Sequence, residues 1–349
     1  MNQVLIHDKK RYKVGGLELD NELWLAPLAG ITMAPVREFF SSLGAGLTHT
    51  EMISCMGLLR DNRKTENMLL LLPSENCSAE SSNAGSTNVV LQLFSGDADS
   101  MAGGAEAALT ANARMGPLRF AALGINMACP MPKVTKRGAG AALMGMPAVA
   151  SEMTRGLKRL GLPVWVKTRV SSDISETLRF LELLFEAGAD NVCIHGRTPA
   201  QRYEGRADRM KTAEAARRFP GGISASGDVY QVEDVKEYLD MGCVGVMLAR
   251  GVLANPYLFP QALYALGREQ RKRKISDADI NPTKENRLSQ LRLLGERIRE
   301  ISGAGHAVVL IKRILSGTLK GTPGAAELRR RVGVTTDLDE LLRLLECGI

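Results

Sequence analysis

One short stretch of the chain carries an isolated thiol in a setting that suggests chemistry. Residues 125–134 read INMACPMPKV, so Cys129 stands between a predicted strand end and two prolines. A cysteine there is a catalytic group, a metal ligand or a small core residue. The six cysteines form no Cys-x-x-Cys or Cys/His cluster, which argues against a zinc site and a disulfide framework. Cys193 and Cys243 lie inside apolar runs, and we expect them to be core thiols.

Other chemically capable residues recur at the ends of predicted strands. Buried charges are expensive, so core packing does not explain polar groups at the same end of every strand. The pattern therefore predicts an active site at that end. The residues are Pro27, Leu28, Ala29, Gly30, Glu51, Gln92, Asn126, Cys129, Lys167, Arg169, His195, Arg197, Ser226, Gly227, Asp228, Ala249, Arg250 and Gly251.

The elements that must position these residues are short apolar strands alternating with amphipathic helices. Strands are predicted over 23–30, 47–54, 89–96, 119–127, 163–170, 191–198, 222–229 and 244–251. Strands buried on both faces indicate a parallel sheet, and eight strand–helix units in about 260 residues favour an α/β fold, a closed (β/α)₈ TIM barrel. An open doubly wound sheet is the alternative, but the expected Gly-x-Gly-x-x-Gly turn after its first strand is missing.

The last quarter of the chain has a different character. The predicted domains are a barrel over 1–260 and an all-helical domain over 261–349. The first part carries 28 basic and 27 acidic side chains, whereas the second carries 17 and 11. This excess of positive charge suits a polyanion-binding appendage, although a solvated helical surface explains it equally well. Residues 74–88, rich in Ser and Asn, are predicted to form a loop.

Composition limits the location and the class of the protein. No apolar run reaches the roughly 18 residues that a membrane span needs, and the start shows no secretory signal pattern. We therefore expect a cytoplasmic protein with no membrane partner and no metal. Aromatic residues make up only 5% of the chain, so few platforms for stacking single-stranded nucleic acid are expected.

The last two predicted strands end in sequences that suit a phosphate group. They read SGD over 226–228 and ARG over 249–251. Glycine-containing loops beside an arginine form the usual phosphate site of a barrel, although two ordinary turns would look the same. A phosphate there would bring a cofactor's reactive part against Lys167 and His195. A cation stabilises the negative charge of a reduced flavin, and the amide of Gln92 can bond ring heteroatoms, which together favour FMN over a dinucleotide.

Several motifs, in this order, resemble those of one enzyme family, the tRNA-dihydrouridine synthases. The matching segments read LAPLAGIT, HTEMIS, VLQLFSGD, INMACPMPKV, VKTRV, IHGRTPAQRYEGRAD, SGDV and MLARGVLANPYLF. The closing IKRILSGTLKGTPGAAELRRRV is similar to the helical domain of that family. The resemblance runs over roughly residues 20–335. Its most specific parts are Asn-x-x-Cys-Pro-x-x-Lys-Val and His-Gly-Arg-Thr-x-x-Gln.

The resemblance implies an FMN-dependent reductase that acts on uridine in folded tRNA, with NADPH or NADH as reductant. Hydride would pass to C6 of an extruded uracil, and Cys129 would protonate C5 from the opposite face. Asn126 and Arg197 would contact the substrate, and the basic helical domain would grip tRNA phosphates. A monomer is expected. The implied FMN-binding residues are Pro27, Leu28, Ala29, Gln92, Lys167, His195, Ser226, Gly227, Asp228, Ala249 and Arg250.

The chain departs from the family pattern at several positions. Gly124 stands where the family has Asp, Ala128 where it has Gly, Ser226 where it has Asn and Ala249 where it has Gly. Residues 32–37 also replace the usual Thr-Asp-x-Pro-Phe-Arg by TMAPVR. These changes bear more on substrate identity than on cofactor identity.

Two other functions are compatible with the same residues. An FMN barrel of the dihydropyrimidine or dihydroorotate dehydrogenase type also carries an Asn-x-x-Cys-Pro-like loop, but it acts on a free pyrimidine and has no use for a basic helical tail. A flavin- or RNA-binding protein without catalysis would explain the altered loops. Retention of Cys129, Lys167 and His195 counts against it.

Overall fold

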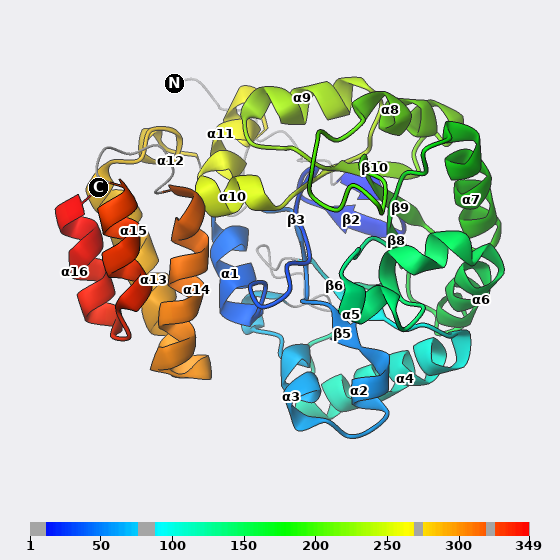
Figure 1. Ribbon diagram of the computed structural model, residues 1–349, viewed down its shortest axis with the longest axis horizontal. Coiled ribbons are helices and arrows are strands. Elements are labelled where there is room, and N and C mark those ends of the chain that lie inside the picture. Colours follow the sequence, from blue (N-terminus) through cyan, green and yellow to red (C-terminus); the bar gives the residue numbers. More distant parts are fainter. Residues whose placement is uncertain (1–11, 76–87, 269–274, 319–324, 349) are drawn as a thin grey trace, which may run out of the picture.

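A computed structural model shows eight parallel strands that close into a barrel, with helices around the outside (Figure 1). The structure describes residues 12–75, 88–268, 275–318 and 325–348. Closure comes from the pairing of β4 with both β3 and β6. The predicted TIM barrel is confirmed. Its strands are β3 (Leu23–Leu25), β4 (Leu47–His49), β6 (Asn88–Phe94), β7 (Ala122–Asn126), β8 (Val164–Arg169), β9 (Asn191–His195), β10 (Ile223–Ser226) and β11 (Val246–Leu248).

The outer helices form because their apolar residues repeat at helical spacing. In α7 (Ile174–Glu186) the buried residues are Thr177, Phe180, Leu181 and Leu184, and Asp173 caps the first turn. The other helices of this layer are α1 (Ala34–Ser42), α4 (Ala98–Met115), α6 (Pro147–Lys158), α8 (Arg209–Arg218), α9 (Val232–Asp240), α10 (Arg250–Ala254) and α11 (Leu258–Ala265). Short helices and turns at the barrel rim are α2 (Cys55–Leu58), α3 (Arg63–Glu66), α5 (Pro132–Thr135), η1 (Asn67–Leu69), η2 (Pro73–Glu75) and η3 (Gly140–Gly145).

Most of the predicted strands extended too far at their carboxyl ends. The predicted strand 47–54 is broken into β4 and β5 (Ile53–Ser54), both of which pair with β6. The predicted strand 244–251 ends at Leu248, because Ala249 leaves the extended conformation and α10 begins. Apolar and glycine residues continue past these strand ends, so the sequence pattern does not mark where hydrogen bonding to the neighbouring strand stops.

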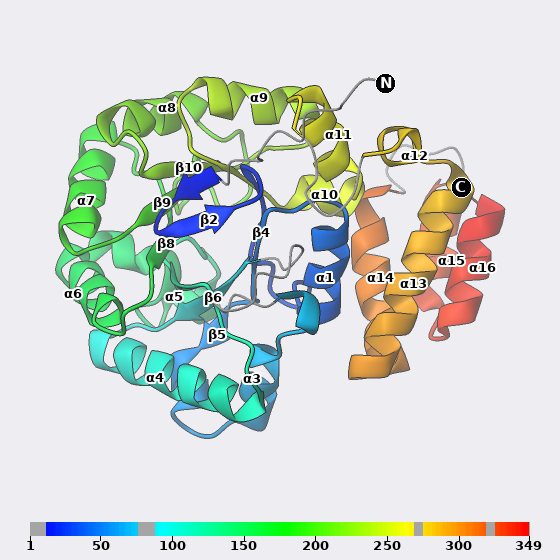
Figure 2. The same ribbon diagram turned by 180° about the vertical axis from the view of Figure 1, so that it is seen from behind.

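An antiparallel hairpin that the sequence analysis did not predict covers the amino-terminal end of the barrel. It consists of β1 (Tyr12–Val14) and β2 (Leu17–Leu19), and Figure 2 shows it in front of the barrel strands. Its apolar residues pack with Trp24 and Trp165, whose ring centroids are 5.0 Å apart. The indole N–H of Trp165 donates to the carbonyl oxygen of Gly15 at 2.9 Å. The sequence feature that could have predicted this hairpin is the Gly15-Gly16 pair, which stands between two short segments in which apolar and polar residues alternate.

The C-terminal helices pack beside the barrel as a separate layer (Figure 1). They are α12 (Asp277–Ile280), α13 (Lys284–Ser302), α14 (Ala304–Thr318), α15 (Ala325–Val334) and α16 (Leu338–Gly348). Helix α13 packs against α1, where Arg297 Nε lies 3.3 Å from Glu38 Oε2, and α14 packs against α10. The division at residue 260 remains a prediction, and α11 crosses it. Residues 76–87 of the predicted loop and 269–274 of a predicted helix lie outside the described residues.

Candidate active site

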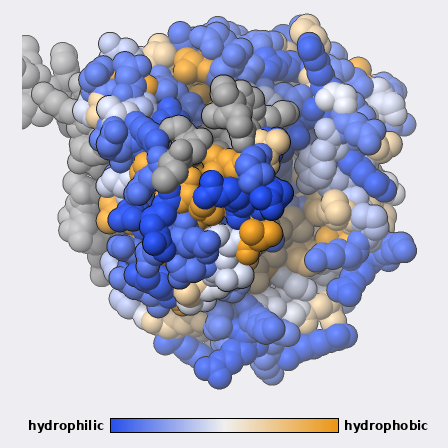
Figure 3. Space-filling model, turned by 60° about the vertical axis from the view of Figure 1, so that its left-hand side comes forward, coloured by the Kyte–Doolittle hydropathy of each residue, from blue (hydrophilic) through white to orange (hydrophobic). Residues whose placement is uncertain are grey.

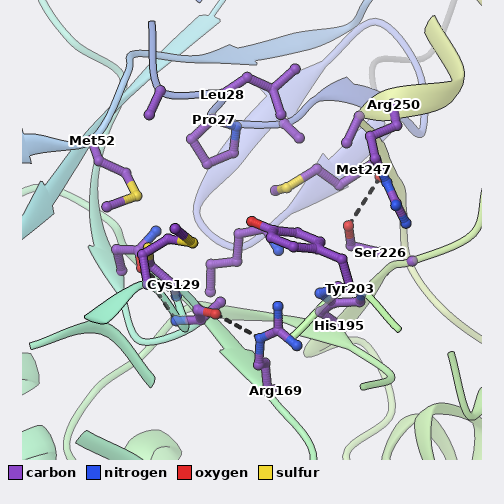
Figure 4. A pocket seen from close by; sticks show the side chains of 18 of the residues that line it. Pro27, Leu28, Met52, Cys129, Arg169, His195, Tyr203, Ser226, Met247 and Arg250 are labelled. Atoms are coloured by element: carbon purple, nitrogen blue, oxygen red, sulfur yellow. Dashed lines mark hydrogen bonds between the residues drawn. The ribbon is translucent and has the colours of Figure 1, made fainter. Parts of the chain in front are cut away.

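A cavity of about 390 Å³ opens at the carboxyl ends of the barrel strands, where the sequence placed the site. Its wall includes every residue predicted to react with or bind the cofactor or substrate, except Gln92 and Arg197. Of the other strand-end residues, Arg169 and Gly251 line the cavity, whereas Gly30 and Glu51 do not. Figure 4 shows Cys129 and Met52 on one side, Arg250 and Ser226 on the other, and the ring of Tyr203 between them. The predicted residues in the wall are Pro27, Leu28, Ala29, Asn126, Cys129, Lys167, His195, Ser226, Gly227, Asp228, Ala249 and Arg250.

The loop that carries Cys129 is held from two sides. Asn126 Oδ1 accepts hydrogen bonds from the N–H of Ala128 at 3.2 Å and from that of Cys129 at 3.0 Å. Arg169 Nε donates to the Ala128 carbonyl at 2.7 Å. Gly140 makes a close approach possible, since a Cβ there would lie 2.6 Å from the Cys129 carbonyl oxygen. The half-buried thiol is therefore fixed at the cavity wall, and one predicted substrate contact, Asn126, also orients it.

The floor of the cavity carries a buried lysine without an acidic partner among the described residues. Lys167 forms no hydrogen bond or ion pair with any residue in the described ranges, and burial lowers its pKa. Burial also lowers the pKa of His195 to about 2, with repulsion from Lys167 as the next cause, so the imidazole is neutral. Arg197 Nη1 lies 3.3 Å from His195 Nε2 and must donate to it, which leaves the ring proton on Nδ1. This floor suits an anionic or electron-rich ring.

The corner formed by the ends of β10 and β11 has the features of a phosphate site. Gly227 and Asp228 both have positive φ, +116° and +49°, and their backbone N–H groups donate to no described residue. The carboxylate of Asp228 is paired with two arginines: Oδ2 accepts from Arg197 at 2.8 Å, and Oδ1 from Arg250 at 3.3 Å. The positive φ of a non-glycine residue is strained, and such strain gathers at functional sites.

Two predicted residues stand apart from the cavity wall. Gln92 is 2% exposed inside the barrel, where Thr50 Oγ1 accepts from its backbone N–H at 2.9 Å. Its side-chain Nε2 has no hydrogen-bond partner in the described part of the chain. The buried guanidinium of Arg197 is engaged by Asp228, His195 and two backbone carbonyls. The geometry therefore does not favour the predicted contact of Arg197 with substrate; this residue holds the loop after β9.

Sequence reasoning missed the aromatic residues at the cavity mouth. Tyr203 is 53% exposed and lines the cavity, with the guanidinium carbons of Arg169 and Arg250 at 5.8 and 5.6 Å from its ring centroid. Tyr230 lies 5.8 Å from the same Arg250 carbon. The segment QRYEGRAD appears above only as part of a family motif. Its tyrosine, in an otherwise polar loop, could have indicated that an aromatic ring lies at the cavity mouth. Met52 also lines the cavity and was not predicted.

The described residues contain no group of three or more His, Cys, Asp or Glu side chains that could hold a metal ion. Among them, no helix is long and apolar enough to cross a membrane. Of the residues in the cavity wall, Asp228 is the only one with a carboxylate, whereas Lys133, Lys167, Arg169 and Arg250 are basic. Fold and site together define a (β/α)₈ barrel protein with a cationic ligand cavity and a helical appendage.

Comparison with known proteins narrows this class to one family. The family model described as dihydrouridine synthase matches residues 24–348. The chain is 29% identical to the probable tRNA-dihydrouridine synthase 1 of Synechocystis sp., over 97% of this chain and 90% of the relative. It is 28% identical to tRNA-dihydrouridine synthase B of Vibrio cholerae over 96% and 97%, and 32% identical to the Pasteurella multocida protein of that name over 71% and 70%. The chain belongs to the dihydrouridine synthase family.

Proposed function

We propose that this protein is a tRNA-dihydrouridine synthase, which reduces the C5–C6 double bond of specific uridines in tRNA with NADPH or NADH through FMN. The observation that carries the proposal is one cavity whose wall holds the fixed thiol of Cys129 together with Lys167, with Arg250 on the side opposite Cys129 (Figure 4). Relatives that match almost the whole chain bear the same name.

The residues present fit FMN. The unused N–H groups of Gly227 and Asp228, with the guanidinium of Arg250, would hold its phosphate. The orphaned amide nitrogen of Gln92 would donate to a ring heteroatom, and Lys167 would offset negative charge on the ring. Pro27, Leu28, Ala29, His195, Ser226 and Ala249 would line the remainder of the flavin site. Bound FMN would supply the hydride that reaches C6 of uracil.

The residues of this chain would position the base and deliver the proton. Cys129 would transfer its Sγ proton to C5 of uracil, because its loop is held by Asn126 and Arg169 at the cavity wall. The side-chain nitrogen of Asn126, which makes no hydrogen bond to described residues, would bond the uracil edge. Substrate uridine would have to leave its stack to reach this depth, as in other base-modifying enzymes.

The helical appendage favours RNA over a free pyrimidine. The C-terminal quarter holds most of the net positive charge of the chain, and α14 packs against α10, whose first residue lines the cavity. A basic surface of this kind binds phosphates and steers a polyanion toward the site. Figure 3 shows a largely hydrophilic face with a hollow in it, as expected for a wet nucleic-acid interface.

A genetic experiment with a matched variant tests the proposal. The protein should purify yellow with FMN, and bulk tRNA from a deletion strain should lack dihydrouridine that the wild-type gene restores and Cys129→Ala does not. Unchanged dihydrouridine in the deletion strain, together with oxidation of free dihydrouracil by the purified protein, would show that the substrate is a free pyrimidine. A colourless protein that binds tRNA would show an RNA-binding module instead.

A further inference from the structure

One glycine beside the cavity wall, Gly30, is held by side chains from two different layers of the molecule. Arg313, on α14 of the C-terminal helices, donates from Nη1 to the carbonyl oxygen of Gly30 at 2.6 Å. Glu51, which follows β4 in the barrel, accepts a hydrogen bond from the N–H of the same glycine through Oε1. Gly30 directly follows Pro27, Leu28 and Ala29, which line the cavity.

The turn around Gly30 is shaped to receive both partners. The N–H groups of Ile31 and Thr32 both donate to the Leu28 carbonyl at 3.0 Å, which closes the turn. Gly30 has φ +70°, and a Cβ at this position would lie 2.3 Å from Arg313 Nη1. The left-handed backbone therefore favours glycine, and a side chain at this position would also push the Arg313 guanidinium aside.

Glu51 ties this turn to the deeper part of the site. Its own carbonyl accepts from Thr50 Oγ1 at 2.9 Å, and the same hydroxyl oxygen accepts from the N–H of Gln92. The next residue, Met52, lines the cavity. Burial raises the pKa of Glu51, while the bond from Gly30 and the charges of Arg37, Arg313 and His306 act in the opposite direction. Two of those charged groups, Arg313 and His306, belong to α14.

Helix α14 reaches the cavity from a second direction as well. It packs against α10 (Figure 1), whose first residue, Arg250, follows β11, the strand next to β3, and also lines the cavity. One helix of the appendage is thus attached at two neighbouring places beside the same cavity. We propose that Glu51 and Arg313 are positioning residues. They link the position of the C-terminal helices to that of the Pro27–Ala29 wall, so that RNA bound to the helices holds this wall in the conformation that the reaction needs. This proposal rests on the proposed function.

Kinetics and hydrogen exchange on the full-length, FMN-loaded protein test the link. Arg313→Ala and Glu51→Gln should each lower kcat with an unmodified tRNA transcript about tenfold, the size expected for one charge-assisted hydrogen bond. The double variant should be no slower than the slower single variant, because both side chains hold the same glycine, Gly30. Arg313→Lys should recover part of kcat. Exchange of the amides in 26–33 should rise in both single variants, and added tRNA should protect this segment only in the wild type.

The matched control is Arg330→Ala. Arg330 is an exposed arginine on α15, paired with Glu327, so its removal takes the same charge from the helices without touching the barrel. We expect this variant to raise KM for tRNA and to leave exchange of 26–33 unchanged. If Arg313→Ala behaves like Arg330→Ala, or if the effects of Glu51→Gln and Arg313→Ala on kcat add, the proposal is overturned. Failure of the wild type to reduce uridine would overturn the proposed function instead, and the exchange data would still test the link.

Discussion

The two ends of the barrel are built from the same strands but have opposite character. On β8, Trp165, Lys167 and Arg169 alternate along one face of the strand. Trp165 packs with Trp24 and the hairpin in an apolar layer, whereas Lys167 and Arg169 line the cavity at the other end. The amino-terminal end is filled by apolar side chains, while the carboxyl end keeps the N–H groups of Gly227 and Asp228 and the side chain of Lys167, which have no partner among the described residues. Stability and chemistry are therefore separated along the strand, as is usual in barrels of this type.

The largest expected effect is on chemistry at the carboxyl end. Replacing Cys129 by Ala should lower the rate of dihydrouridine formation by about 10²–10⁴-fold, the usual contribution of a general acid. The unfolding free energy should change by less than about 1 kcal/mol, since the thiol is only half-buried. Single-turnover kinetics with a tRNA transcript and urea unfolding measure the two quantities. A variant that keeps the wild-type rate would remove Cys129 from the reaction.

The largest expected effect on stability lies at the other end. Trp165→Ala removes a 3% exposed indole, its contact with Trp24 and its hydrogen bond to Gly15, so it should lower the unfolding free energy by about 3–5 kcal/mol. Binding of FMN to the fraction that remains folded should change little. Urea unfolding and titration of flavin fluorescence check both statements. A loss below about 1 kcal/mol would mean that the hairpin layer contributes little to stability.

Two buried histidines should make stability depend on pH in different windows. Burial lowers the pKa of His49 to about 4 and that of His195 to about 2, so both are neutral when folded. Unfolded histidines bind protons below about pH 6.5, whereas the folded ones stay neutral. Each histidine should therefore lower the unfolding free energy by about 1.4 kcal/mol for every unit by which the pH falls below about 6.5. The contribution of His49 should end near pH 4 and that of His195 should continue toward pH 2.

Single variants separate the two contributions. His49→Gln and His195→Gln should each reduce the slope of unfolding free energy against pH between 6.5 and 4.5 by about 1.4 kcal/mol per unit. Below pH 4 only His195→Gln should still differ from the wild type in slope. Urea unfolding at a series of pH values measures these slopes. An unchanged slope in either variant would mean that the corresponding histidine is protonated in the folded state.

The smallest expected effect tests how the hairpin is held. Lys13 Nζ lies 3.3 Å from Glu18 Oε1 across the hairpin, but the side chains are 78% and 44% exposed. Lys13→Ala should therefore change the unfolding free energy by less than about 0.5 kcal/mol. Leu19→Ala, at a 1% exposed position, should cost about 2–4 kcal/mol. Equal effects of the two substitutions would show that the hairpin is held by charge instead of by apolar packing.

The sequence predicted the barrel because its strands are buried on both faces, and such runs stand out against amphipathic helices. It also identified most residues of the cavity wall, since strand ends in a barrel converge on one face. It did not reveal that the Arg197 guanidinium is paired with the carboxylate of Asp228. Such pairings depend on how a loop returns across the site, and short-range patterns contain no information about that path.

Contacts between segments far apart in the chain could not be predicted from the sequence either, because short-range patterns do not show how the chain folds back on itself. The bond between Arg313 and Gly30 spans 283 positions and depends on how α14 seats on the barrel. The hairpin, in contrast, could have been predicted from the glycine pair at 15–16. A search for helices and parallel strands does not detect such a turn. The strand ends were misplaced because apolar residues beyond β11 and β10 line a cavity and not a sheet.

The hairpin across the amino-terminal end has a kinetic consequence. The hairpin covers that end and packed side chains fill the barrel beneath the cavity, so ligands of the described cavity enter and leave through its mouth, which Tyr203 lines. In the proposed reaction, a reduced nicotinamide and an extruded uracil would need the same space above the flavin, so they would have to take turns. Initial rates measured at several concentrations of the nicotinamide and of the tRNA should then give parallel lines in double-reciprocal plots. Such lines indicate a double-displacement mechanism, in which the enzyme holds two electrons after the first substrate leaves and before the second binds.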